Sequence, residues 1–220
     1  TLVAKLAAHT PVVGDGEAET GPLATSWHGN KFLNPKTDGT VLPILHLNGY
    51  KIANPTVLGR MTDEELKNYF NGLNYSPIFV EGRDRRTMHL KMAKAMDSVV
   101  KTINKMKSTG EINKWPMIIL RTPKGWTGPK EYAGQLIENS FRAHQVPFPA
   151  EPKNLPLLES WLKSYHADEL FDDKGKLLKE IRDILPTGKK RMGMNPITNG
   201  GLLLKDLVVP KMHDYEFKIG

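Results

Sequence analysis

An aspartate flanked by glycines, in the run Gly14-Asp15-Gly16-Glu17, is the first feature of this 220-residue sequence that could do chemistry. It follows a short apolar segment that reads as a strand. Glu17 and Glu19 would repel a diphosphate unless a cation stood between them. A strand end with glycines and a carboxylate therefore predicts a metal ion that bridges the protein and a diphosphate.

Two common phosphate-binding loops do not fit the same run. A Walker loop would end in Gly-Lys-Ser or Gly-Lys-Thr, and a dinucleotide-binding fingerprint would have glycine at the position of Glu19. The sequence has neither of these patterns, so a diphosphate bound through a metal ion remains the preferred interpretation.

A second polar run, Asn48-Gly49-Tyr50, follows the next apolar segment about thirty residues later. Magnesium prefers a few hard oxygen ligands in a near-octahedral array. Asp15 offers a carboxylate oxygen, Asn48 an amide oxygen and Tyr50 a main-chain carbonyl, while Gly49 leaves the backbone unobstructed. The two runs together resemble the magnesium-binding signature of thiamine diphosphate enzymes.

Strands and helices are expected to alternate along the first two thirds of the chain. This order predicts an α/β fold with a doubly wound, mostly parallel sheet. Ligands of such sheets collect at the carboxyl ends of the strands, where Asp15, Asn48 and Lys124 fall. The expected strands are 10–13, 41–47, 76–80 and 115–120, and the expected helices are 23–27, 62–71 and 84–107.

Composition narrows the chemistry further. The sequence has no cysteine, which excludes disulfide scaffolds, thiolate zinc sites and thiol nucleophiles. The net charge of +7 fits a surface for nucleic acid or a funnel for phosphorylated small molecules. Many lysines fall on the predicted helix 84–107, so a solvated face is the simpler interpretation and no nucleic-acid partner is predicted. No apolar run approaches a membrane span, and we expect a cytoplasmic location without a membrane partner.

Longer blocks of the sequence closely resemble phosphoketolases, and the resemblance extends over nearly the whole chain. These blocks are 13–28, 42–56, 120–129, 141–147, 191–196 and 199–201. The resemblance implies that residues 1–148 form an incomplete part of a thiamine diphosphate-binding module of the diphosphate (PP) type. Residues 149–220 are expected to form a connector of helices and loops that leads toward a pyrimidine-binding module absent from this sequence.

The resemblance implies which residues bind the cofactor. Asp15, Asn48 and the Tyr50 carbonyl would bind Mg²⁺, for which Ca²⁺ could substitute. The residues that would line the diphosphate of thiamine diphosphate are Gly14, Gly16 and Glu17.

Two further residues carry a catalytic role by resemblance only. Lys124 would lie in the cofactor and substrate pocket, and His144 would face the reacting centre. From the sequence alone, Lys124 reads as a solvated charge and His144 as a structural histidine. His28 and His46 adjoin the two motifs and are candidates for a supporting role.

A phosphoketolase cleaves xylulose 5-phosphate, and often fructose 6-phosphate, with inorganic phosphate to give acetyl phosphate and a shorter aldose phosphate. We expect the full-length enzyme to be a homo-oligomer and this chain, as an internal fragment, to be inactive alone. Two alternatives stay open: ketol transfer of the transketolase kind, and a basic binding module without catalysis. Phosphate-dependent release of acetyl phosphate would distinguish a phosphoketolase from the first alternative. Salt-dependent binding of nucleic acid would indicate the second.

Overall fold

A four-stranded parallel sheet forms the centre of the computed structural model, which describes residues 8–144, 147–188, 191 and 194. The strand order is β2-β4-β8-β7, and every neighbouring pair is parallel. The prediction of a parallel α/β sheet is therefore confirmed. The strands are β2 (Val12–Gly14), β4 (Ile44–Leu47), β7 (Tyr75–Glu81) and β8 (Trp115–Arg121).

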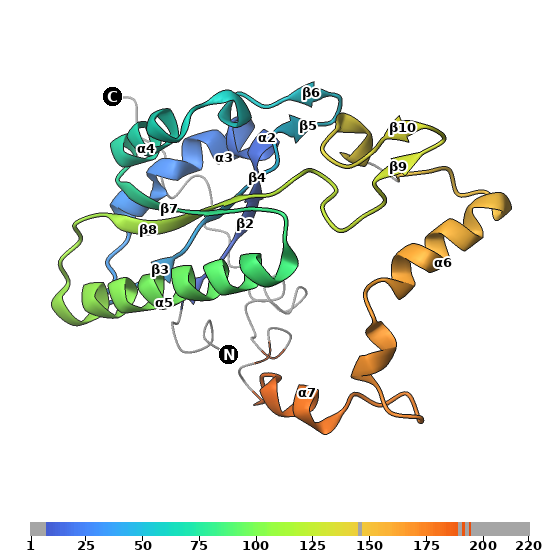
Figure 1. Cartoon of the computed structure of the whole chain (residues 1–220). Helices are drawn as coiled ribbons and strands as arrows, with labels where there is room; N and C mark the ends of the chain where they lie inside the picture. The colour runs from blue at the N-terminus through green and yellow to red at the C-terminus, as the bar shows by residue number, and fades with distance from the viewer. Residues whose placement is uncertain (1–7, 145–146, 189–190, 192–193, 195–220) are drawn as a thin grey trace, which may run out of the picture.

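Helices cover both faces of this sheet (Figure 1). The long helix α5 (Arg85–Thr109) lies along one face, and α2 (Asp15–Ala18), α3 (Gly21–Ser26) and α4 (Asp63–Gly72) lie on the other. The central strand β8 serves both layers, because its side chains alternate between two apolar clusters. Met117 and Ile119 join the cluster under α4, and Ile118 joins the cluster under α5.

Local sequence signals explain where the two longer helices begin and end. Thr62 and Glu65 form a reciprocal capping box at the start of α4. Asp84 accepts a hydrogen bond from the Thr87 backbone amide at the start of α5, which ends at Gly110 with φ of 77°. The predicted helices 62–71 and 84–107 are thus confirmed to within two residues.

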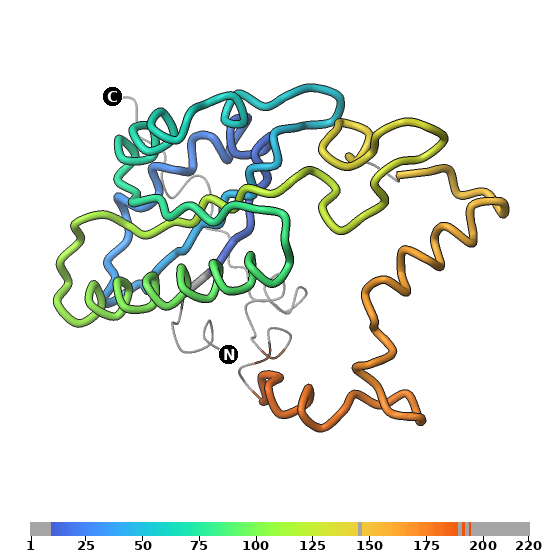
Figure 2. The backbone as a smooth tube through the Cα atoms, viewed as in Figure 1, coloured from blue at the N-terminus to red at the C-terminus, as the bar shows by residue number. Residues whose placement is uncertain are grey.

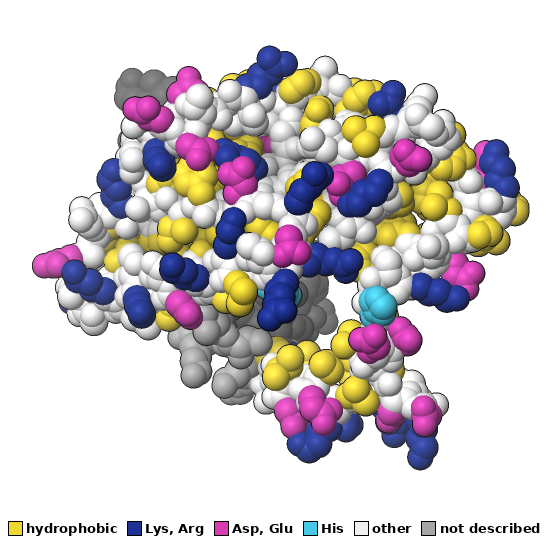
Figure 3. Space-filling view, viewed as in Figure 1, with side chains coloured by type: hydrophobic (Ala, Val, Ile, Leu, Met, Phe, Trp, Pro, Cys, Tyr) yellow, Lys and Arg dark blue, Asp and Glu magenta, His cyan; other side chains and the backbone are white. Residues whose placement is uncertain are grey.

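Four of the five lysines predicted to form a solvated face of α5 do so, and the fifth, Lys107, is half-buried. Lys91, Lys94, Lys101 and Lys105 are exposed, while Val99 and Ile103 are fully buried on the opposite side of the helix. Figure 3 shows the basic side chains of this face spread among acidic ones rather than gathered into one patch. This distribution is typical of an ordinary hydrated surface.

Two predicted elements were wrong in extent. The expected strand 41–47 is divided into β3 (Thr40–Val41), which pairs with β1 (Ala8–His9), and β4. Pro43 lies between them, and a proline has no amide hydrogen for a strand ladder, although its carbonyl accepts from Ile118.

The expected helix 23–27 begins earlier, as α3, since Pro22 occupies its first turn. It is followed by the 3₁₀ helix η1 (Trp27–Phe32).

Short elements lie along the carboxyl edge of the sheet (Figure 2). After them, residues 150–188 form an extended segment that we call the arm. The edge carries the hairpins β5–β6 (Tyr50–Lys51 and Asn54–Pro55) and β9–β10 (Glu131–Tyr132 and Gln135–Leu136), with η2 (Leu58–Arg60) and η3 (Phe141–His144). The arm contains η4 (Pro152–Asn154), α6 (Leu155–Lys163), η5 (Ala167–Leu170) and α7 (Lys179–Ile184).

The arm leaves the sheet after Pro149, close to the expected boundary at residue 148, but its role as an interdomain connector stays a prediction. The resemblance blocks 191–196 and 199–201 lie outside the described residues except for Arg191 and Met194. No helix in the described part of the chain has the length and apolar character needed to cross a bilayer.

Candidate functional site

The two predicted metal-binding runs meet at the carboxyl edge of the sheet. Strands β2 and β4 are paired in parallel with Gly14 opposite His46, so the chain leaves both strands at the same level. Asp15 follows β2 and Asn48 follows β4. The parallel register therefore places both runs side by side, as expected for a ligand site in a doubly wound sheet.

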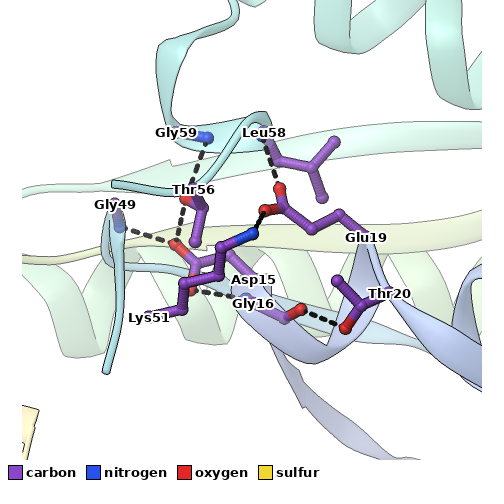
Figure 4. A network of polar contacts seen from close by, with 9 residues as sticks. All are labelled: Asp15, Gly16, Glu19, Thr20, Gly49, Lys51, Thr56, Leu58 and Gly59. Carbon is purple, nitrogen blue, oxygen red and sulfur yellow. Dashed lines mark hydrogen bonds and ion pairs between the residues drawn. The ribbon is translucent and has the colours of Figure 1, made fainter. Parts of the chain in front are cut away.

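Asp15 accepts several hydrogen bonds at this edge, and Figure 4 shows its contacts. Its side chain is almost wholly buried, at 1% exposure. One carboxylate oxygen accepts from the Gly16 amide at 3.0 Å, and the other accepts from the Gly49 amide at 2.6 Å and the Thr56 hydroxyl at 3.0 Å. Three neutral donors therefore hold a charged carboxylate in one orientation, in contact with the second run.

The second run forms a tight turn that directs its carbonyl groups. The Asn48 side-chain oxygen accepts from the Tyr50 amide at 3.2 Å, which closes an Asx-type turn. Gly49 has φ of 89°, a conformation that favours glycine. The turn leaves the Tyr50 carbonyl oxygen to accept from the Lys124 ammonium at 2.9 Å.

Lys124 reaches this carbonyl from the third strand end. It lies three residues after β8, and its backbone carbonyl accepts from the Asn139 amide at 2.8 Å. The lysine is buried, at 8% exposure. Burial lowers the pKa of its ammonium group, and the negative charge of Asp15 opposes that shift. Asp15, Tyr50 and Lys124 are therefore brought together at one point of the edge.

His46 and Thr122 lie beneath this point. The Nε2 atom of His46 lies 2.9 Å from the Thr122 hydroxyl, joining β4 to the residue after β8. Burial lowers the pKa of His46; Asp15 acts in the opposite direction and Lys124 adds to the lowering. His46 thus lies beside the site residues, and a supporting role for it stays a prediction. Within the described residues, no side chain at this edge makes a polar contact with His28.

The residues predicted to line the diphosphate lie at the end of β2 and on the first turn of α2. Gly16 is a close-approach position, because a Cβ there would stand 2.6 Å from the Cβ of Lys51. Gly14 ends β2 in an extended conformation, and Glu17 is exposed. The structure thus places all three at the correct edge, and their role in binding a diphosphate stays a prediction.

Several residues at this edge escaped the sequence analysis. Glu19 forms an ion pair with Lys51 at 2.6 Å and accepts from the Leu58 amide at 3.0 Å, so its charge is compensated. Thr56 is fully buried and supports Asp15. Neither partner could be found from spacing, because both contacts depend on how the β5–β6 hairpin folds back over α2.

His144 lies on η3, which packs against β5. It is exposed on η3 and lines a cavity of about 520 Å³ with Ile52, Phe141 and Phe148. Asn48 and Tyr50 line a different cavity, of about 570 Å³, together with three arginines that the sequence analysis missed: Arg60, Arg83 and Arg121. Among the predicted site residues, Asn48 and Tyr50 thus line one cavity and His144 the other, while neither lining includes Gly14, Asp15, Gly16, Glu17 or Lys124.

The donor set at the edge suits a hard cation. No group of three or more His, Asp or Glu side chains in the described part of the chain could hold a metal ion, so a site here depends on one carboxylate with amide and carbonyl oxygens. Asp15, Asn48 and Tyr50 supply that set. The Lys124 ammonium already lies on the Tyr50 carbonyl, which marks this oxygen as a place that accepts positive charge.

Comparison with known proteins decides the family. The model described as the XFP N-terminal domain matches residues 5–203. The chain belongs to this family. A relative named probable phosphoketolase 2 from Nostoc sp. (strain PCC 7120 / SAG 25.82 / UTEX 2576) is 56% identical over 217 residues, covering 94% of this chain and 27% of that protein.

Other relatives of this XFP N-terminal domain carry similar names. The probable phosphoketolase of Thermosynechococcus vestitus is 56% identical over 213 residues, with 93% of this chain and 26% of that protein covered. The probable phosphoketolase 2 of Lactiplantibacillus plantarum is also 56% identical over 213 residues, with 93% and 27% covered. The resemblance to phosphoketolases is confirmed, and the chain spans about a quarter of the length of these curated relatives.

Proposed function

We propose that this chain is the part of a phosphoketolase that binds the diphosphate of thiamine diphosphate through Mg²⁺. The observation that carries the proposal is the buried carboxylate of Asp15, joined by a 2.6 Å hydrogen bond to the Asn48–Tyr50 turn at the carboxyl edge of a parallel sheet. The names of the relatives, at 56% identity, support the choice of reaction.

In this proposal, the reaction is cleavage of xylulose 5-phosphate, and of fructose 6-phosphate where the pocket admits it, by inorganic phosphate. The products are acetyl phosphate, a shorter aldose phosphate and water. Thiamine diphosphate, when bound, supplies an electron sink for cleavage of the carbon–carbon bond. The residues of this chain bind, orient and exchange protons.

Each predicted residue has a specific task. Asp15, Asn48 and the Tyr50 carbonyl would hold the cation, while the Gly14–Glu17 segment would lie against the diphosphate at the start of α2. The Lys124 ammonium would stabilise negative charge that develops on substrate oxygens. The His144 imidazole would give and take a proton at a ring nitrogen.

The substrate would lie next to the arginine-lined cavity. Arg121 pairs with Asp63 and Glu81, both at 2.7 Å, and Arg83 pairs with Glu138 at 3.0 Å. Because these guanidinium groups already have carboxylate partners, we assign them to shaping the cavity rather than to binding phosphate. Arg60 is exposed at the same cavity and is the better candidate for contact with an anionic ligand.

Calorimetry with thiamine diphosphate and Mg²⁺ tests the proposal. The native chain should bind the pair, and Asp15→Ala should weaken binding by more than about 100-fold, because a first ligand of the cation is lost. Asp15→Asn keeps the side-chain shape and should fail in the same way. Asp97→Asn, an exposed carboxylate on α5, is the control and should bind as the native chain does.

Activity gives the second arm of the test. The isolated chain should release no acetyl phosphate from xylulose 5-phosphate and phosphate, and the same variants in the complete enzyme should follow the calorimetric order. Native binding by Asp15→Asn in both settings would contradict the assignment. Ketol transfer without acetyl phosphate release by the complete enzyme would instead favour a transketolase reaction.

A further inference from the structure

The contact between Lys124 and Tyr50 conflicts with the cation proposed for the same place. The Lys124 ammonium donates to the Tyr50 carbonyl at 2.9 Å, and that carbonyl is one of the three proposed magnesium ligands. An ammonium and a divalent cation repel each other strongly at such short range. Both therefore cannot lie on this oxygen at once.

The contact between Lys124 and Tyr50 lies in a buried part of the site. Lys124 is 8% exposed and Asp15 is 1% exposed. A buried carboxylate is unfavourable without a compensating positive charge. Within the described residues, no basic side chain forms a direct ion pair with Asp15, and the Lys124 ammonium lies on the Tyr50 carbonyl of the same turn whose Gly49 amide donates to Asp15. The ammonium thus compensates the carboxylate where the cation would.

We propose that Lys124 holds the cation position in the metal-free protein and is released when the divalent cation binds. This inference depends on the proposed function of the edge. It makes Lys124 a positioning residue for the Tyr50 turn in one state and frees its ammonium for substrate in the other. Binding of the cation would then control when the lysine becomes available.

The structure provides room for that movement. Lys124 lies on a backbone fixed by the Asn139 amide, so only its flexible side chain needs to turn. Thr122, Pro123 and Asn139, its neighbours in sequence and space, line the cavity of about 570 Å³ beside the Tyr50 turn. The released ammonium would therefore point into the cavity where we place the substrate.

The first experiment compares two lysine variants of the 220-residue chain, with Mg²⁺ and inorganic pyrophosphate as the probe. Lys124→Met removes the competing ammonium and should bind the probe about tenfold more tightly than the native chain, since a charged hydrogen bond no longer has to be broken. Lys94→Met is the control. It removes an exposed lysine on α5, away from the sheet edge, and should change affinity by less than about threefold.

The second experiment follows the native lysine directly, so it does not depend on how the variants fold. Acetylation of each lysine is measured by mass spectrometry with and without Mg²⁺ and pyrophosphate. Lys124 should react several times faster when the cation is bound. Lys114, which donates to the Asn71 side chain at the opposite end of β8, should react at the same rate in both states.

The outcomes separate the two proposals. If the native chain takes up no Mg²⁺ with pyrophosphate, the proposed function of the edge fails, and the inference about Lys124 fails with it. If the native chain takes up the cation but Lys124 reacts no faster and Lys124→Met binds no more tightly than Lys94→Met, only the role of Lys124 is overturned.

Discussion

The cavity beside Asn48 and the cavity beside His144 share the β5–β6 hairpin, yet they are built in different ways. The cavity beside Asn48 and Tyr50 is backed by buried polar groups whose partners all come from the sheet and its loops. The cavity that contains His144 is lined mainly by apolar side chains of loops and short elements, and its histidine is exposed. The described residues fix the polar groups beside the first cavity, whereas they give the His144 side chain in the second no polar partner.

This difference divides the carboxyl edge into two parts, which we call the Asp15 half and the His144 half. It shows what fixes the geometry of each half. The Asp15 half is held by the parallel register of β2, β4 and β8, so its geometry follows from the fold. The His144 half depends on an exposed 3₁₀ turn, and nothing in the described residues fixes the orientation of its imidazole. We therefore expect substitutions in the first half to alter folding stability and those in the second to alter chemistry only.

The largest effect should follow Asp15→Ala. The change leaves the Gly16 and Gly49 amides and the Thr56 hydroxyl without their acceptor, and buried unpaired donors cost about 1–3 kcal/mol each. We expect the free energy of unfolding to fall by about 3 kcal/mol in urea titrations. A loss below about 1 kcal/mol would show that the edge is not organised by this carboxylate.

Thr56→Val should have the next largest effect. It keeps the shape of a fully buried side chain but removes the hydroxyl that donates to Asp15, which should reduce the free energy of unfolding by about 1–2 kcal/mol. The matched control is Thr127→Val, which removes an exposed hydroxyl beside Tyr165 and should cost less than about 0.5 kcal/mol. Equal losses in the two variants would remove the distinction between the two halves.

His46 should make the stability of the sheet edge depend on pH. Burial lowers its pKa below the usual 6.5, so below that pH the unfolded chain binds a proton that the folded chain does not. Stability should therefore fall as the pH drops below about 6.5, until the folded-state pKa is reached. Unfolding titrations of native chain and His46→Gln between pH 7.5 and about 5 check this, and the variant should lose part of the slope. Parallel slopes would show that His46 does not contribute.

The smallest effect on stability should come from His144→Ala. The side chain is exposed, so the free energy of unfolding should change by less than about 0.5 kcal/mol. Turnover of the complete enzyme should nevertheless fall far more than cofactor affinity does. Unchanged turnover would remove His144 from the mechanism, and a large loss of stability would contradict the contrast between the cavities.

The sequence predicted the parallel sheet and the placement of Asp15 beside the Asn48–Tyr50 turn because both follow from strand order and the shared carboxyl edge. It did not predict Thr56 or Glu19, since their contacts depend on the path of the β5–β6 hairpin. The division of strand 41–47 could have been foreseen from Pro43. The roles of Lys124 and His144 came from resemblance, because a single lysine or histidine carries no pattern of its own.

The cation position is tested most directly by a crystal structure of the chain with Ca²⁺ and thiamine diphosphate. The account predicts an anomalous peak about 2.3–2.6 Å from an Asp15 carboxylate oxygen, the Asn48 amide oxygen and the Tyr50 carbonyl. The Lys124 ammonium should then lie away from Tyr50. A calcium ion bound elsewhere, with Lys124 still on the Tyr50 carbonyl, would contradict the account.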